Sequence, residues 1–422
     1  MLNIIYDASI VTNIFYKNDN RSGIFFVGLN ILNELANRRD VNVMLYFSPD
    51  VYSDGVRLKE EFYPNLDCIQ DLSKLSILCK LHKRFRHWYD ICYRHLYLRK
   101  FFALGLVATG AFFKAKININ EKKAQIASAF FSPVIKIPLE IRAYPHIKNF
   151  IYLHDAIPFV KPELNPYGKR FITEIINSTQ EDDFFFFNST CSQNDFKKIA
   201  PTVIKENSAV IPLAARLKYE VTNAPETMVN IRRKYHIPEG KKYVFSLCTL
   251  EPRKNLLRAV KAFIYFVKKY KLNDIVWLMG GSAWVPFMRT LKKETSQWKE
   301  APIIFAGYVD DEDLPLLYGN AEWFVYTSQY EGFGLPPLEA MQCGCPVITS
   351  NNSSLPEVVG DAGLMIDWDS EEQHVEAYVK YYFKEKLRKE YGQRGLERAN
   401  LFSWKNTTDM ILNKISLVVK EH

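Results

Sequence analysis

Cysteine is scarce in this sequence, and the cysteines it has form no recognisable motif. Seven are scattered over 422 residues, an odd number, and no two are spaced as CxxC. Cys343 and Cys345 are close together, but one intervening residue is poor spacing for a zinc site, so we assign both to core packing. The pattern predicts reduced thiols in a cytosolic protein rather than a disulfide framework.

Long hydrophobic runs are also missing. The apolar run at 101–113 is well below the ~20 residues that a membrane-spanning helix needs, and it contains two glycines. The chain begins directly with a strand pattern and shows no basic n-region, so we expect no secretory signal. We therefore expect a cytoplasmic protein, with attachment to the inner face of the membrane as an option.

Two glycine motifs for nucleotides are absent as well. No G-x-G-x-x-G follows a strand pattern, and no G-x-x-x-x-G-K-[ST] occurs. These absences argue against dinucleotide oxidoreductases and P-loop enzymes, because both classes place phosphates on such loops.

The sequence does have enough apolar residues for two cores. Residues of the hydrophobic class make up 48% of the chain, and 422 residues exceed the size of one ordinary domain. In the first half, strand patterns alternate with helix patterns, which predicts parallel strands with helical crossovers. These strands are expected at 2–6, 41–47 and near 129, 150, 184 and 210, with a helix at 24–36. A more regular alternation follows, with strands at 243–247, 275–279, 303–306, 323–326, 347–349 and 364–366.

The alternation divides the chain into two α/β, Rossmann-like domains. We expect an acceptor-side domain at 1–214 and a nucleotide-sugar-binding domain at 215–400, because the pattern lapses into polar residues between 214 and 242. The segment 401–422 has helical periodicity and is expected to pack back onto the first domain.

Positive charge is concentrated in one short segment. The formal net charge is +8, and 80–100 contains seven Lys or Arg against one Asp. Leu81, Phe85, Trp88, Cys92 and Leu96 recur at helical spacing, so a helix here would carry an aromatic stripe with cationic flanks. Such a helix could lie on an anionic membrane surface, so we expect a peripheral membrane contact through 80–113. The alternative is a solvated basic face on a helix packed into the core.

The most informative stretch is Glu331-Gly-Phe-Gly-Leu-Pro-Pro-Leu-Glu339, which follows a strand pattern and leads into a helix pattern. Amides around Gly332, Phe333, Gly334 and Leu335 would lie at a helix N-terminus, where they can bind a diphosphate. Glu339 can accept hydrogen bonds from a pair of ribose hydroxyls, and Glu331 can face a sugar.

A second cluster, Thr249-Leu-Glu-Pro-Arg253-Lys254-Asn255, follows the strand at 243–247. Two cations at the carboxyl end of a parallel strand can clamp a pair of phosphates, and Asn255 can cap the next helix. Isolated Arg-Lys pairs are otherwise mostly solvated surface. In the first half, His154-Asp155 ends an apolar strand, a position where such a pair is about as often structural as functional.

The string from Glu331 to Glu339, continued by Gly344-Cys-Pro-Val-Ile348 and Ser354-Leu-Pro-Glu-Val358, resembles the retaining family-4 glycosyltransferases. The resemblance covers nearly all of the second half, and the first half only at Gly23 and His154-Asp155. It implies the GT-B fold, two Rossmann-like domains facing each other across a donor-binding cleft.

The resemblance also implies residue roles. Arg253 and Lys254 would neutralise the leaving diphosphate, with Glu331 and His154 completing the catalytic set. Donor binding would fall to Glu339, Gly23, Ser328, Gly332, Phe333, Gly334, Leu335, Tyr308, Val309 and Asp155, with Tyr308 and Val309 passing under the nucleobase. Many relatives carry an earlier arginine where this chain has Cys248 or Thr249, and the sequence leaves open whether Arg253 replaces it.

We therefore expect a retaining transferase that moves a hexose or deoxyhexose, mannose-type favoured, from a nucleoside-diphosphate sugar to a saccharide acceptor. The acceptor is expected to be lipid-linked, in bacterial surface-polysaccharide synthesis, with no cofactor, no metal and no nucleic acid involved. The acidic runs 310–313 and 367–369 are expected to be surface loops rather than metal sites. The alternatives are a nucleotide-sugar epimerase or another GT-B relative without a sugar acceptor, and a non-enzymatic membrane scaffold.

Overall fold

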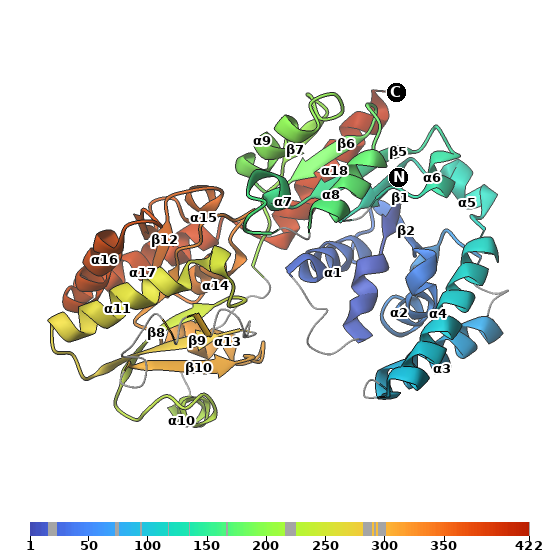
Figure 1. Cartoon of the computed structure of the whole chain (residues 1–422). Coiled ribbons are helices and arrows are strands. Elements are labelled where there is room, and N and C mark those ends of the chain that lie inside the picture. Colours follow the sequence, from blue (N-terminus) through green and yellow to red (C-terminus); the bar gives the residue numbers. More distant parts are fainter. Residues whose placement is uncertain are drawn as a thin grey trace.

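The structure is a computed structural model that describes residues 1–15, 23–71, 76–92, 95–116, 118–134, 136–165, 168–215, 225–281, 289–290, 293 and 301–421. It has two α/β domains side by side, each built on a parallel sheet (Figure 1). Arg21 and Ser22, the start of the expected glycine-bearing turn, lie outside the described residues.

The first domain contains a seven-stranded sheet with the order β3-β2-β1-β4-β5-β6-β7. Its elements are β1 (Leu2–Asp7), η1 (Ser9–Phe15), α1 (Gly23–Ala36), β2 (Val41–Tyr46), η2 (Pro49–Val51), α2 (Tyr52–Phe62), β3 (Asp67–Cys68), α3 (Ser76–Ile91), α4 (Leu96–Lys116), α5 (Glu121–Ile126), β4 (Ala129–Ser132), α6 (Leu139–Arg142), β5 (Lys148–Leu153), α7 (Ile157–Val160), α8 (Lys169–Asn177), β6 (Phe184–Phe187), α9 (Thr190–Ile199) and β7 (Ser208–Val210).

The second domain contains a six-stranded sheet with the order β10-β9-β8-β11-β12-β13. Its elements are α10 (Pro225–Lys234), β8 (Lys242–Leu247), η5 (Pro252–Lys254), α11 (Leu256–Lys269), β9 (Ile275–Gly280), β10 (Ile303–Gly307), α13 (Leu314–Gly319), β11 (Trp323–Tyr326), α14 (Leu335–Gln342), β12 (Val347–Ser350), α15 (Leu355–Val359), β13 (Gly363–Ile366), α16 (Glu371–Phe383) and α17 (Glu385–Ala399), followed by α18 (Trp404–Lys420).

Alternate residues of each strand point to opposite faces, and both faces of each sheet are covered. In the first sheet, Tyr6, Leu45 and Phe131 pack toward α1 and α18. Ile5 and Phe130, one position away on the same strands, pack on the other side with α8 and α9. This double coverage explains why strands such as Phe184–Phe187 are apolar without interruption.

In each sheet the strand order reverses once. The first three strands run outward from β1 to β3, and β4 then returns to the other side of β1; β8 and β11 repeat this arrangement. In open parallel sheets, ligands bind at the carboxyl ends of the strands at such a reversal. The fold therefore predicts a ligand-binding site at the loops after β8 and β11.

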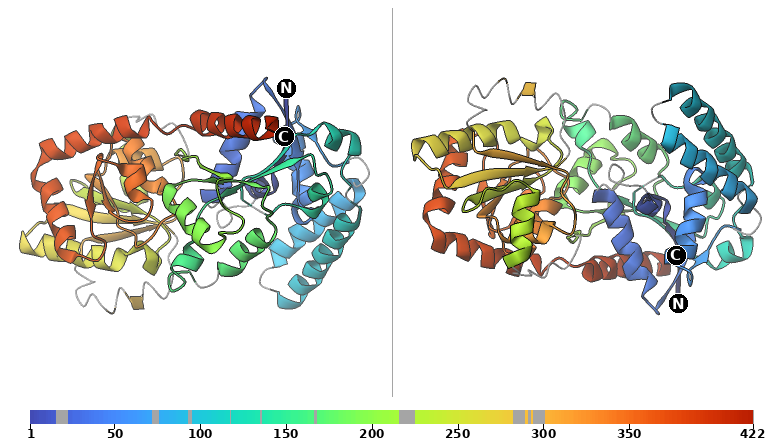
Figure 2. Two further views of the ribbon diagram at one scale, coloured as in Figure 1. Left: turned by 90° about the horizontal axis from the view of Figure 1, so that it is seen from above. Right: turned by 90° about the horizontal axis from the view of Figure 1, so that it is seen from below.

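The last helix, α18, packs on the first domain, as predicted. In the views of Figure 2 it leaves the second domain and lies along the first. Trp404 Nε1 donates to the carbonyl of Ala215 at 2.7 Å, and Thr407 Oγ1 donates to the carbonyl of Pro212 at 2.8 Å. Arg38 at the end of α1 pairs with Asp409. The two-domain architecture with a returning helix is the GT-B fold expected from the sequence.

Two elements differ from the sequence-based expectations. The polar stretch at 214–242, where the strand and helix patterns lapse, contains helix α10, whose Ile231 is buried. The basic segment is a hairpin of α3 and α4 rather than one helix, with the His95 amide bonded to the Cys92 carbonyl where α3 ends. Phe102 of α4 stacks on Trp88 of α3, so the two helices bury part of the aromatic stripe against each other.

Candidate functional site

The centre of the candidate site is an ion cluster at the reversal point of the second sheet. Lys254 follows β8, and its Nζ lies 2.6 Å from Glu331 Oε1 in the loop after β11. The same Nζ donates to Tyr326 Oη, at the end of β11, at 2.7 Å. Lys254 and Glu331 side chains are each 9% exposed, so this pair is buried and not solvated surface.

Arg253 completes the cluster on the other oxygen of Glu331. Its Nη1 lies 2.8 Å from Glu331 Oε2 and also donates to the Tyr330 carbonyl at 2.8 Å. Its Nη2 pairs with Glu251 Oε1 at 2.7 Å. Burial lowers the pKa of Arg253, but the surrounding groups, with Glu331 first and then Tyr326 and Glu251, together outweigh burial, so the pKa lies above its usual value. Arg253 therefore connects the loops that follow β8 and β11. Arg253 and Lys254 pair with both carboxylate oxygens of Glu331, so this pairing needs no further cation at Cys248 or Thr249.

The charges near Glu331 have a larger effect on its pKa than burial does. Burial alone would raise the pKa of this carboxyl, but the charges of Lys254 and then Arg253 lower it to about 2. The side chain of Ser328 also contributes a hydrogen bond that lowers the pKa. Glu331 is thus ionised at neutral pH and holds both cations at the end of the sheet.

The cluster retains donors for an anion. A lysine ammonium has three N–H donors, and the contacts to Glu331 and Tyr326 use two. The amide of Leu335, the first residue of α14, also lacks a partner within the helix, whereas Pro336 and Pro337 carry no N–H. Gly334 precedes it at φ +124°, a conformation that favours glycine. Lysine, arginine and a helix N-terminus therefore converge at one place where a diphosphate would be stabilised.

Gly23 of the first domain lies against the start of α14. It is the first residue of α1, and a Cβ placed on it would lie 3.5 Å from Leu335 Cδ1. Neither α1 nor α14 has an acidic residue in its first turn. The positive ends of two helix dipoles therefore lie near each other with no carboxylate of their own to compensate them.

Glu339 lies one turn further along α14 and is completely buried. Its Oε2 accepts a hydrogen bond from Tyr318 Oη of α13 at 3.1 Å. The carboxylate is thus oriented by a neighbouring helix behind the anion-binding end of α14.

His154 and Asp155 stand opposite the cluster, at the end of β5. The Pro133 carbonyl lies 2.8 Å from His154 Nε2, and because a carbonyl can only accept, Nε2 carries the proton. Burial lowers the pKa of His154 to about 4. The ring is therefore neutral at pH 7, and its Nδ1 is a hydrogen-bond acceptor.

Asp155 links the two domains electrostatically. Burial raises the pKa of its carboxyl, Arg253 and Lys254 lower it, and Glu331 raises it, so all three second-domain charges lie within electrostatic range. Gly332 is the point of closest approach: a Cβ on it would lie 2.7 Å from both Asp155 Cβ and the His154 carbonyl oxygen. The two domains meet at this glycine.

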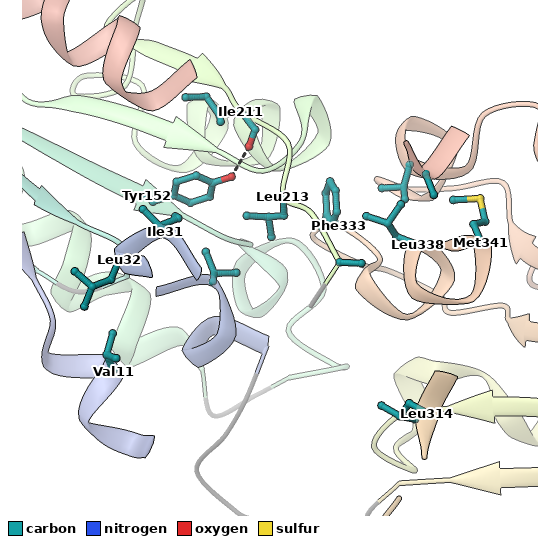
Figure 3. Packing of buried hydrophobic residues seen from close by; sticks show 14 of the residues in the cluster. Val11, Ile31, Leu32, Tyr152, Ile211, Leu213, Leu314, Phe333, Leu338 and Met341 are labelled. Atoms are coloured by element: carbon teal, nitrogen blue, oxygen red, sulfur yellow. Dashed lines mark hydrogen bonds between the residues drawn. The ribbon is translucent and has the colours of Figure 1, made fainter. Parts of the chain in front are cut away.

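Apolar packing supports the same junction. Phe333 and Leu213 lie close together between the domains in Figure 3, within one continuous cluster of buried side chains. Phe333 also packs edge-on against Phe402, with ring centroids 6.1 Å apart. Phe333 is therefore placed as an apolar contact between the domains, beside the amides that could bind an anion.

Tyr308 and Val309 lie away from the ion cluster. They follow β10, three positions from β11 in the sheet, which corresponds to about 14 Å at the usual strand spacing. Tyr308 is 52% exposed and Val309 is buried. This separation suits the two ends of an extended nucleoside-diphosphate sugar.

The acidic runs form ion pairs. Lys234 Nζ lies 2.5 Å from carboxylate oxygens of both Asp310 and Asp313, and Asp369 pairs with Arg258. Within the described part of the chain, no group of three or more His, Cys, Asp or Glu is arranged to hold a metal ion.

Asn255 sits at the N-cap of α11, but its side chain donates to the Trp368 carbonyl instead of capping the helix.

Sequence reasoning missed several residues of this junction. Tyr326, which orients Lys254, looked like an ordinary apolar strand residue, although its place at the carboxyl end of β11 is a signal for function. Ser189, Ser192 and Glu357 contact the opposite domain, and no local pattern could have paired them across more than a hundred residues.

Comparisons with known proteins agree with this geometry. Residues 228–398 match the family model "Glycosyl transferases group 1". The chain is 37% identical over 199 residues to the O-antigen chain mannosyltransferase B of Escherichia coli, covering 47% of this chain and 51% of that protein. It is 28% identical over 273 residues to the serotype-specific mannosyltransferase WbdA of Escherichia coli, covering 63% of this chain and 33% of that protein. The chain thus spans about half, or a third, of the length of these curated relatives.

These likenesses support a glycosyltransferase. Solved structures support its GT-B fold over the full length of the chain. Sucrose-phosphate synthase from Thermosynechococcus elongatus superposes with a TM-score of 0.66 at 15% identity, covering all of both chains. HepE from Anabaena, solved with UDP and glucose, gives 0.62 at 15% identity and covers 99% of this chain and 100% of that one.

No helix among the described residues is long and apolar enough to cross a membrane.

Proposed function

We propose that the chain is a retaining glycosyltransferase that moves a hexose from a nucleoside-diphosphate sugar to a saccharide acceptor. The observation that carries the proposal is the buried cluster of Arg253, Lys254 and Glu331 at the reversal of the second sheet. It lies near the N-terminus of α14, and Asp155, next to His154, is within electrostatic range of all three of its charges. An anionic leaving group bound there would have its sugar directed toward the first domain.

The chemistry follows from where negative charge develops. As the bond between the sugar and the diphosphate breaks, the leaving oxygen gains charge, and the remaining donors of Lys254 and Arg253 stabilise it together with the α14 amides. The sugar gains oxocarbenium character and is attacked on the face that the diphosphate leaves. The leaving phosphate accepts the proton of the acceptor hydroxyl. Retention at the anomeric carbon follows from this front-face geometry.

Neutral His154 has a positioning role in this proposal. A neutral imidazole whose Nε2–H is donated to Pro133 presents Nδ1 as an acceptor, which suits a hydroxyl of the donor sugar. Glu339 binds the ribose hydroxyls, while Tyr308 and Val309 lie near the base. Arg253, Lys254 and the helix amides supply the positive charge that a metal ion supplies in other transferases, so we propose that transfer is metal-independent.

We further propose a mannose-type sugar and a role in bacterial surface-polysaccharide synthesis. The printed names of the curated relatives, O-antigen and serotype-specific mannosyltransferases, support this substrate class. A saccharide acceptor of this kind is built on a lipid carrier, which would bring the enzyme to the cytoplasmic face of a membrane.

The α3–α4 hairpin is our candidate for that attachment. It lies at the end of the first domain remote from the second (Figure 2). One side of α4 exposes large apolar residues, with Tyr97 86%, Phe101 61%, Leu104 69% and Val107 69% exposed. Exposed Arg84, Arg99 and Lys100 lie on the same hairpin. Apolar side chains flanked by cations suit the interface of an anionic bilayer, where each nearby Lys or Arg contributes about 1 kcal/mol.

Liposome sedimentation tests this attachment. The protein is expected to pellet with vesicles that contain phosphatidylglycerol and to be released by high salt. Replacing Phe101 and Leu104 by Ser should abolish pelleting. The matched control is Leu139→Ser on α6, a leucine that is 85% exposed but outside the hairpin. Equal recovery in the supernatant with anionic and neutral vesicles would remove the membrane contact from the proposal.

A screen of nucleoside-diphosphate sugars tests the proposed activity. The purified protein is incubated with each donor, with and without a mannose-terminated oligosaccharide, and the products are separated by mass spectrometry. We expect a product one hexose heavier than the acceptor with one donor. An isomerised nucleotide sugar formed without acceptor would replace the transferase by an epimerase.

A further inference from the structure

Glu357 belongs to the second domain but binds the first. It lies on α15, and its Oε2 and Oε1 accept hydrogen bonds from the backbone amides of Thr190 at 2.7 Å and Cys191 at 2.8 Å. These are the first two residues of α9. The next amide, that of Ser192, is capped by Ser189 Oγ at 3.0 Å. The N-terminus of α9 is therefore capped jointly by its own serine and by a carboxylate from the opposite domain.

This contact is favourable only when the domains are together. Two charge-assisted hydrogen bonds and the positive end of the α9 dipole stabilise the Glu357 carboxylate in this position. If the domains separated, both amides and the carboxylate would have to return to water. Glu357 thus favours the arrangement in which β5 and the loop after β11 face each other.

The segment that carries Glu357 also holds the backbone of Glu331. The Glu331 amide donates to Ser353 Oγ at 3.1 Å. Ser354 Oγ lies within hydrogen-bonding distance of the carbonyls of Glu331 and Phe333, at 3.0 and 2.7 Å. Arg398 of α17 donates to the Glu357 carbonyl at 2.6 Å and so fixes the same segment from behind.

The N-terminus of α9 also contacts the loop after β11 directly. Ser189 Oγ donates to the Gly332 carbonyl at 2.7 Å. Ser192 Oγ lies within hydrogen-bonding distance of the carbonyls of Gly332 and His154, at 3.1 and 2.9 Å. The contacts therefore close a ring: Glu357 holds α9, the α9 serines hold Gly332, and Ser353 and Ser354 connect the Glu331 loop back to Glu357. The Glu331 loop is thus connected to α9 both directly and through the segment that carries Glu357.

We propose that Glu357 is a positioning residue that couples closure of the two domains to the placement of Glu331. It touches neither donor nor acceptor and acts through α9 and the turn at 353–354. The coupling is a property of the fold, and only its effect on turnover rests on the proposed function.

Hydrogen exchange tests the coupling without any substrate. In Glu357→Ala, amides in peptides covering 189–193 and 329–335 should exchange roughly 10-fold faster than in the parent protein. Glu357→Gln is isosteric and keeps one acceptor oxygen, so it should fall between the two. The matched control is Glu371→Ala, an exposed glutamate in the first turn of α16. Faster exchange at 189–193 with no change at 329–335 would overturn the proposal, in either variant.

Kinetics add a second test. The groups that would bind the nucleoside diphosphate belong to the second domain, so its Kd by calorimetry should change less than about 2-fold in Glu357→Gln, while kcat falls roughly 10-fold. An unchanged kcat would overturn the positioning role. If the parent protein transfers no sugar but the exchange pattern is as expected, the proposed function fails and the coupling stands.

Discussion

The two sheet edges that face each other differ in the ionisation of their buried side chains. At the edge of the second domain, Glu331 is buried, yet its pKa falls to about 2 because Lys254 and Arg253 lie against it. At the edge of the first domain, burial dominates: it raises the pKa of Asp155 and lowers that of His154 to about 4. Similar burial therefore gives a paired, ionised carboxylate on one side and a neutral imidazole on the other.

The difference indicates a division of labour. An edge with fixed charges suits an anion whose charge grows during the reaction, because the donors need no reorganisation. An edge with a neutral imidazole suits hydroxyl groups, which need directional acceptors rather than charge. In this account the diphosphate belongs to the second domain and the sugar lies between the two.

Removing a cation from the charged edge should have the largest effect. Lys254→Ala is expected to lower kcat by ~10²–10³-fold, because a positioned donor to the leaving oxygen is lost. Lys389→Ala on α17, a lysine that is 77% exposed, is the matched control and should keep the parent rate. Parent-like turnover of Lys254→Ala with saturating donor would show that the charged edge does not act on the leaving group.

A smaller effect is expected at Glu339, behind the anion-binding end of α14. Glu339→Ala should weaken binding of the free nucleoside diphosphate by ~1–3 kcal/mol, because the ribose hydroxyls lose their acceptor. Calorimetry measures this directly, and Glu339→Gln should retain part of the affinity. If both variants bind like the parent, Glu339 holds Tyr318 and α13 rather than the nucleotide.

The neutral imidazole of His154 should make the free energy of unfolding depend on pH. An imidazole has a pKa of about 6.5 in an unfolded chain. In the folded protein the pKa of His154 is about 4. Between these values the unfolded state binds more protons, so the free energy of unfolding falls as pH drops from about 6.5 to about 4, by at most about 1.4 kcal/mol per pH unit. Urea unfolding of His154→Gln should show a shallower dependence, and identical profiles would show that His154 is not held neutral.

No effect is expected from metal removal. If the fixed charges of the second domain do the work of a metal ion, transfer persists in excess EDTA at the parent rate. Loss of activity with EDTA and its recovery with manganese would assign the charge stabilisation to a metal instead.

The two edges also differ in how well the sequence predicted their structure. The strands of the second sheet and the returning helix were predicted because apolar strand runs alternate with helices and turns at regular intervals, and the GT-B fold was implied by the family resemblance. The loop from Glu331 to Leu335 and the helix after it could be placed because glycine, proline and glutamate occupy adjacent positions in the chain. The assignment of residues to donor binding stays a prediction.

The contacts between the domains could not be read in this way. That Glu331 pairs with both Arg253 and Lys254 depends on the adjacency of β8 and β11, which are distant in sequence. The junction of Gly332 with His154, and the capping of α9 by Glu357, join residues more than 140 positions apart. The membrane contact predicted at 80–113 includes most of α4, but the sequence did not show that α4 folds back onto α3.

The most direct test of the central claim is the anomeric configuration of the first product. NMR follows the transfer from an α-linked nucleoside-diphosphate sugar, and the one-bond coupling between C1 and H1 of the new linkage gives its anomeric configuration. If the diphosphate leaves along Lys254 and Arg253 and the acceptor attacks on the same face, the new linkage is α. A β-linked product would mean attack from the opposite face and would contradict the account.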